Sequence, residues 1–105
     1  MTTMFFRHGD LVLTTTTIPE QAHRTHKGRL VLAEGEVTGH AHVIDSPDAE
    51  LWGTAGSDML FLRVLADAGV DLFHDEHDTL TIPPGDWRVT RQREYAPEAP
   101  LYVAD

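Results

Sequence analysis

The chain of 105 residues contains no cysteine. This absence excludes disulfide bonds, thiolate metal ligands and cysteine nucleophiles, and it leaves the redox compartment undecided. Any metal site would therefore use histidine and carboxylate ligands. Long apolar runs are also missing, since no stretch approaches the roughly 20 apolar residues that cross a bilayer, and the run near the N-terminus is too short for a secretory signal. We therefore expect a cytoplasmic protein that does not span a membrane.

Basic side chains are scarce, because eight Lys and Arg residues stand against 17 Asp and Glu residues, for a formal net charge of −9. A protein of this charge repels polyanions, which argues against general DNA binding. Six of the eight basic residues fall in two short stretches, 24–29 and 88–93, so a local basic patch is an alternative to ordinary solvated surface. The length and the hydrophobic content of 41% predict a single domain, residues 1–105, with a modest core.

The histidines are the main candidates for functional residues. Four of the seven stand in two tight pairs, His40-Ala-His42 and His74-Asp-Glu-His77. Imidazole is the commonest metal ligand, and it also exchanges protons near neutral pH. Residues two apart on a strand point to the same face, so His40 and His42 would share one side of a sheet. A spacing of three brings His74 and His77 together on a helical turn or across a β-bulge.

Most of the chain predicts strands. Short apolar and β-branched segments alternate with clusters of turn residues, a pattern typical of a small all-β domain in which a barrel or a sandwich protects the sheet edges. The segments expected to be strands are 10–18, 29–34, 40–44, 49–53, 70–74, 79–82 and 87–95.

Other segments carry loop or mixed signals. Residues 19–28 are expected to be irregular, and the compositions of 45–48 and 83–86 predict turns. Residues 57–69 fit either a helix capped near Ser57 or a central strand, and we favour the strand because the apolar run is short and its neighbours are extended.

The larger aromatic side chains are expected in the core, because they bury much apolar area. These are Trp52, Phe61, Phe73 and Trp87. The three histidines outside the two pairs, His8, His23 and His26, are expected to be loop or surface residues.

Three motifs resemble a family of small uncharacterised bacterial and phage proteins that carries the same ordered set. The motifs are Gly35-Glu-Val-Thr-Gly-His-Ala-His42, His74-Asp-Glu-His77, and the ending Ile82-Pro-Pro-Gly-Asp-Trp-Arg-Val-Thr-Arg-Gln-Arg-Glu-Tyr95. This resemblance spans most of the chain and implies no known activity.

A looser resemblance is to the cupins, which are β-barrels that hold a metal with two or three histidines and a glutamate. The likeness places His40 and His42 in the first cupin motif and His74 or His77 in the second. The chain departs from the pattern, because no glutamate follows the first pair at the expected distance and the second motif is one residue longer. The cupin likeness is therefore an analogy of fold, which does not establish function.

The leading hypothesis is a β-barrel that binds a divalent metal through His40, His42, His74 and His77. Zinc, iron and manganese are the candidate ions, and Glu36, Asp75 and Glu76 are candidate extra ligands or partners of the ligands. Three ligands with an open position would let a bound water ionise near neutrality and attack an ester or phosphodiester, whereas four ligands would make a structural site.

Two alternatives use the same residues differently. Paired imidazoles can cleave RNA by general acid–base catalysis without metal, with His77 in the reaction and Arg91, Arg93 and Tyr95 binding phosphate. The second alternative is that the chain is a non-catalytic module that assembles into a homo-oligomer. A small barrel buries limited surface by itself, so assembly would add to its stability. Substrates under the first two readings would be a small molecule or RNA.

Overall fold

A computed structural model describes residues 4–34, 41–75 and 77–91, and these residues form eight strands and no helix. The all-β prediction is confirmed, including the strand in the ambiguous segment 57–69. The strands are β1 (Phe5–His8), β2 (Leu11–Thr15), β3 (His23–Glu34), β4 (Ala41–Gly53), β5 (Leu60–Val64), β6 (Val70–His74), β7 (His77–Ile82) and β8 (Gly85–Arg91).

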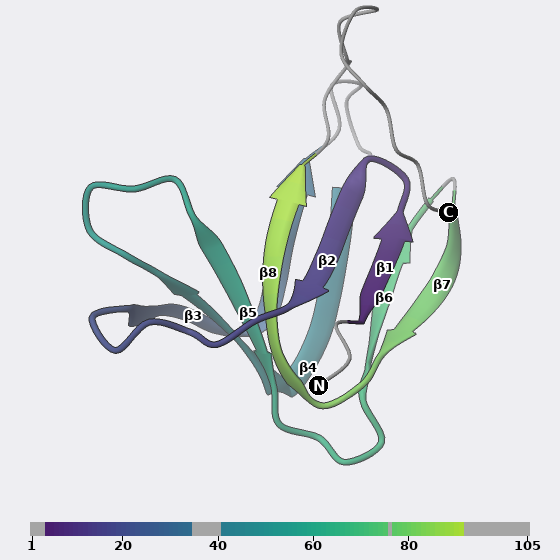
Figure 1. The fold of residues 1–105 in the computed structure, drawn as a ribbon. Helices are drawn as coiled ribbons and strands as arrows, with labels where there is room; N and C mark the ends of the chain where they lie inside the picture. The colour runs from purple at the N-terminus through teal and green to yellow at the C-terminus, as the bar shows by residue number, and fades with distance from the viewer. Residues whose placement is uncertain (1–3, 35–40, 76, 92–105) are drawn as a thin grey trace, which may run out of the picture.

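All eight strands belong to one antiparallel sheet that curls into a nearly closed barrel (Figure 1). The order along the sheet is β1-β2-β8-β5-β4-β6-β7, and β3 pairs with β4 beside this path. Strands β1 and β7 are therefore the two ends of the path. We call the boundary between them the seam.

The long strand β4 carries the centre of the sheet. Its first part pairs with β6 through Val43 and Ile44, and its second part pairs with β5 from Ala49 to Gly53. The predicted turn at residues 45–48 is wrong, because these residues continue β4. The register against β3 jumps there, so the turn-forming residues make a bulge. Proline fits such a bulge, since it cannot donate a ladder hydrogen bond.

Strand β3 begins earlier than the sequence predicts. Residues 23–28, expected to be irregular, pair with the second part of β4. The Arg24 guanidinium lies 3.2 Å from the Glu50 carboxylate across this pairing. Pairing with β4 thus makes a strand of residues 23–28, although their polar local sequence predicts a loop.

The core consists of inward-facing side chains from the barrel strands, with Trp87 and Phe61 among its largest buried members, as expected. The ring of Trp87 lies 5.4 Å from that of Phe6, between centroids. Trp52 is only partly buried, and Phe73 is 45% exposed, so placing Phe73 in the core is wrong. Strand β6 buries its neighbour Leu72, and alternation turns Phe73 outward.

Candidate functional site

Four imidazoles gather at one end of the barrel, and we call them the histidine cluster: His8, His42, His74 and His77. The ring centroids of His42 and His74 are 4.5 Å apart, those of His74 and His77 are 4.6 Å apart, and the longest separation, between His8 and His74, is 6.3 Å. The cluster is buried on one side and open on the other. His8 and His42 are 4% and 2% exposed, His74 is half-buried, and His77 is exposed.

The fold explains how residues so far apart in sequence meet. Inward alternation on β4 places His42 beside the buried Ile44. His74 and His77 are register partners at the end of the β6–β7 hairpin. The register shift in this hairpin sets two residues of β7 opposite Phe73, which is a β-bulge. Of the two geometries predicted for His74 and His77, the bulge is therefore present and the helical turn is wrong.

His8 reaches the cluster because β1 and β2 form a tight hairpin. His8 pairs with Leu11, which leaves only Gly9 and Asp10 in the turn. Gly9 has a φ of +63°, which suits the first position of a two-residue hairpin turn. Gly9 also approaches the cluster closely, because a Cβ atom there would lie 2.5 Å from His77 Nε2 and 3.2 Å from His42 Cε1.

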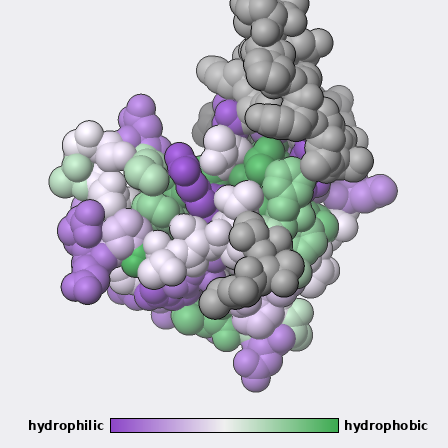
Figure 2. All heavy atoms as spheres, in the orientation of Figure 1, coloured by the Kyte–Doolittle hydropathy of each residue, from purple (hydrophilic) through white to green (hydrophobic). Residues whose placement is uncertain are grey.

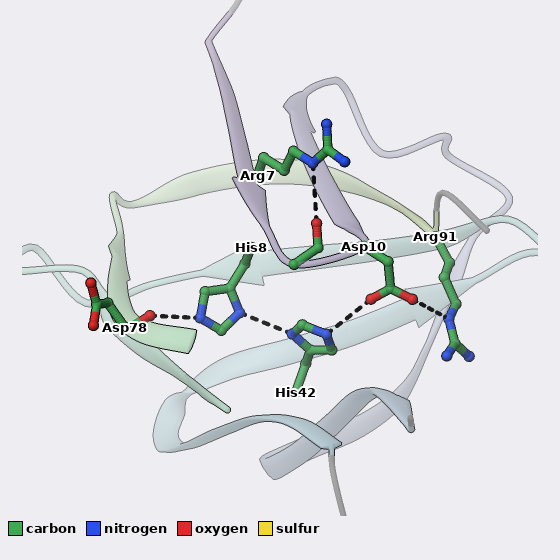
Figure 3. A network of polar contacts seen from close by, with 7 residues as sticks. Arg7, His8, Asp10, His42, Asp78 and Arg91 are labelled. Carbon is green, nitrogen blue, oxygen red and sulfur yellow. Dashed lines mark hydrogen bonds and ion pairs between the residues drawn. The ribbon is translucent and has the colours of Figure 1, made fainter. Parts of the chain in front are cut away.

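A chain of polar contacts runs through the buried half of the cluster (Figure 3). His8 Nε2 lies 2.8 Å from the backbone oxygen of Asp78, and His8 Nδ1 lies 2.9 Å from His42 Nδ1. His42 Nε2 lies 3.2 Å from Asp10 Oδ1, and Arg91 Nε donates to Asp10 Oδ2 at 2.8 Å. The chain thus joins β7, β1, β4, the β1–β2 turn and β8.

Burial favours the neutral form of the two inner imidazoles. Desolvation lowers the pKa of His42 to about 4, with help from the neighbouring His74 and His8 and against the hydrogen bond to Asp10. Desolvation also lowers the pKa of His8. For Asp10, burial acts to raise the pKa, but the hydrogen bonds from Arg91 and His42 outweigh it and hold the pKa below its ordinary value. Asp10 is therefore a carboxylate beside a neutral ring.

The sequence predicted three of the four cluster members. His42, His74 and His77 lie together, while their role as ligands stays a prediction. Arg91 lies beside the cluster through Asp10. Several other predicted site residues lie outside the described residues, namely Glu36, His40, Glu76, Arg93 and Tyr95. Asp75, the remaining candidate, is exposed.

The expectation that His8 is a loop or surface residue is wrong, because His8 lies in β1 and is almost fully buried. Two sequence signals point to its position. Gly9-Asp10 is a typical two-residue hairpin turn, and His8 stands two residues after the inward Phe6 on the same face of the strand. His23 and His26 are exposed on β3, away from the cluster.

No group of three or more His, Asp or Glu side chains within residues 4–34, 41–75 and 77–91 could hold a metal ion with the side chains as they stand. The rings are close, but their nitrogen atoms do not meet at one point. Movement of side chains is therefore a requirement of any metal site built on this cluster.

Comparison with known proteins places the chain in one family. A family model described as "Domain of unknown function (DUF8820)" matches residues 7–92. The chain belongs to this family. The match agrees with the uncharacterised family that the sequence motifs indicated, and it spans the whole histidine cluster. No curated protein and no solved structure matches the chain.

In the part of the chain that the structure describes, we find no helix with the length and apolar character to pass through a membrane. The cytoplasmic location stays a prediction.

Proposed function

We propose that this protein binds a divalent transition metal through His8, His42, His74 and His77. One observation carries the proposal. The Nδ1 atoms of His8 and His42 face each other at 2.9 Å, while the Nε2 atom of each ring points at an oxygen that can only accept a hydrogen bond.

Counting protons shows why this arrangement suits a cation. The contact of His8 with the Asp78 carbonyl needs a proton on Nε2, and the contact of His42 with the Asp10 carboxylate needs another on its own Nε2. The contact between the two Nδ1 atoms needs a third proton. Two neutral imidazoles carry one N–H proton each, so a third would make one ring a cation. Burial opposes that cation, because it lowers the pKa of both rings.

A metal ion in place of the third proton removes the conflict. Both Nδ1 atoms would then present lone pairs to the metal, and both Nε2–H groups would keep their acceptors. Metal-bound histidines almost always donate the second ring N–H to a carboxylate or a backbone carbonyl, which fixes the tautomer and the ring orientation. Asp10 provides the carboxylate for His42, and Asp78 provides the carbonyl for His8.

The spacing of the four rings suits a single ion. A tetrahedral zinc site with metal–nitrogen bonds of about 2.0–2.1 Å holds its imidazole centroids roughly 5 Å apart. The cluster has centroid separations of 4.5 to 6.3 Å. Some of the rings must turn to meet one ion, and His74 and His77 lie on the more exposed side of the cluster, where we expect rotation to be easiest.

The donor set narrows the choice of metal. Imidazole nitrogen suits zinc, iron, copper and nickel, whereas manganese prefers oxygen ligands. Asp10 is already held by Arg91 and His42, so it serves better as a partner of a ligand than as a ligand. Of the three candidate ions named from the sequence, zinc and iron(II) therefore fit the cluster better than manganese.

An ion held by all four imidazoles would be structural, and hydrolysis is the activity we propose for the form in which only three of them bind it. His77 is exposed, so a metal at the cluster would face solvent on that side. With three imidazoles as ligands and water in the fourth position, the ion would supply a hydroxide near neutral pH for the hydrolysis of an ester or phosphodiester. The role of this chain would be to hold the ion and keep the inner rings neutral.

Metal content tests the proposal directly. A protein purified without a histidine tag, stripped with chelator and dialysed against zinc or iron(II) without oxygen, should retain about one ion per chain. His42→Gln should lower the metal content severalfold. His26→Gln is the matched control, because His26 is exposed on β3 outside the cluster, and it should leave the content unchanged.

Two outcomes would contradict the metal site. One is wild-type protein that retains less than ~0.3 ion per chain after gentle purification and reloading. The other is equal zinc content in wild type and His42→Gln. RNA cleavage that survives chelator and disappears in His77→Gln would instead support the metal-independent ribonuclease reading.

A further inference from the structure

The seam is the weakest closure in the barrel wall. Every other neighbouring pair in the strand order is joined by a ladder of paired residues, but no ladder joins β1 to β7 within the described residues. Strand β1 has only four residues, and its ladder partner is β2. One edge of β1 therefore faces β7 without the backbone pairing that closes the rest of the sheet.

Side chains bridge this seam where backbone pairing does not. His8 Nε2 of β1 contacts the backbone oxygen of Asp78 in β7 at 2.8 Å. The bulge in β7 includes Asp78, which frees its carbonyl from regular pairing with β6. The β1–β2 turn adds a second contact, because Gly9 packs against the ring of His77.

The histidine cluster lies across the same seam. His8 comes from β1 on one side, and His74 and His77 come from the β6–β7 hairpin on the other. His42 comes from β4, which pairs with β6. An ion that bound all four rings would therefore link the first and last strands of the sheet, which the ladders leave unlinked.

We propose that a metal ion at the histidine cluster fastens the seam between β1 and β7, and that the seam is looser without the ion, when side-chain contacts such as that of His8 with Asp78 hold it. The proposal rests on the proposed function, because it needs the cluster to bind metal. It adds that the ion controls the shape of the barrel: β1, which carries His8, is the strand that moves, and β4, β6 and β7 stay in place because ladders join them.

The absence of cysteine allows a clean test. Paired spin labels on Phe5→Cys and Thr79→Cys would report the width of the seam, since both positions are exposed and lie on β1 and β7. Zinc is the probe, because it is diamagnetic and leaves the label signal intact. We expect a single narrow distance distribution with zinc, and a shift to longer and broader distances after chelation.

Two controls make the result specific. Labels on Asp71→Cys and Arg88→Cys, on β6 and β8, should give the same distances with and without zinc. Adding His8→Gln to the seam-labelled protein removes the ligand on β1 and keeps a polar side chain there. This variant should still bind zinc, but more weakly. Zinc should no longer narrow the distribution of distances between its two spin labels.

Calorimetric zinc titration of the same labelled samples separates the two proposals. Zinc that binds without changing the seam distances would overturn the fastening and leave the metal site intact. The fastening is also wrong if zinc narrows the distances equally in the His8→Gln protein. Absence of zinc binding in the wild type would refute the metal site itself, and the fastening with it.

Discussion

Asp10 has a central place in the site although it does not need to touch the metal. Its two carboxylate oxygens divide between His42 and Arg91, so it orients the imidazole and is itself held in place. Loss of such a partner usually costs 10–100-fold in metal affinity.

Replacing Asp10 by Ala should therefore weaken zinc binding by about 10–100-fold in a competition titration against a chromophoric chelator. Asp45→Ala is the control, because Asp45 is an exposed carboxylate on β4 and its removal changes the net charge equally. Equal zinc affinity in the two variants would show that the contact of Asp10 with His42 does not contribute to zinc binding beyond the change in net charge.

Gly9 gives a second test at the scale of one residue. Gly9→Ala introduces strain at positive φ and also places a methyl group against His77 and His42. Gly56→Ala is the matched control, since Gly56 has a similar φ of +74° and no atom within 4 Å of an added Cβ. Urea unfolding should show a cost of about 1–2 kcal/mol for the strain in both variants.

Metal affinity should separate the two glycine variants. The added methyl group of Gly9→Ala displaces His77, so this variant should bind zinc at least severalfold more weakly, whereas Gly56→Ala should bind it as the wild type does. Equal zinc affinity in both would mean that the close approach of Gly9 does not matter for the site.

The histidines illustrate what a single sequence can and cannot predict. The spacing of His74 and His77 predicts their proximity, because hairpin neighbours are decided locally. The meeting of His8 with His42 depends on the order of strands in the sheet, and no local pattern encodes that order. His8 looked like an ordinary surface residue for this reason, although the Gly9-Asp10 turn after it was visible in the sequence.

At the scale of the strand, β6 shows how alternation decides burial. Leu72 is fully buried and Phe73 is 45% exposed, although phenylalanine is the larger apolar side chain. Leu72→Ala should lower the free energy of unfolding by about 2–5 kcal/mol, because it leaves a cavity in the core. Phe73→Ala should cost under about 1 kcal/mol in the same urea titration. A larger loss for Phe73→Ala would show that a partner covers this face.

Strand β4 shows why local turn signals mislead. Asp45-Ser-Pro-Asp48 has the composition of a turn, yet the strand continues through it with a bulge. The turn-forming residues do disturb the strand, but they produce a bulge and not a turn. Pairing with β3, β5 and β6 holds both parts of β4 in one sheet. The all-β class survived this error, since it depends on the number of extended segments and not on their limits.

At the scale of the whole molecule, the buried imidazoles predict a pH-dependent stability. The pKa of His42 is lowered from 6.5 to about 4 in the folded protein. Between these two pH values, His42 therefore binds a proton in the unfolded chain but not in the folded chain. The free energy of unfolding should therefore fall as the pH drops from about 6.5 to about 4, by on the order of 3 kcal/mol. The lowered pKa of His8 acts in the same direction.

Urea titrations of chelator-treated protein at several pH values would measure this slope. The variant His42→Gln should have a flatter profile in the same window, because its side chain does not titrate. The low pKa of Asp10 has the same sign, but it acts below the ordinary carboxyl pKa of 3.8 and so leaves the window to the histidines. Stability that stayed constant down to about pH 4 would contradict neutral burial of His42.

The contact between Phe6 and Trp87 has a practical consequence. Trp87 is one of only two tryptophans, and its indole lies against a side chain of β1, whereas the other, Trp52, lies under the guanidinium of Arg63. The two tryptophans of the unlabelled protein thus lie in different surroundings. Tryptophan emission should respond when the first strand moves, because Phe6 of that strand contacts Trp87, whereas the surroundings of Trp52 should stay the same.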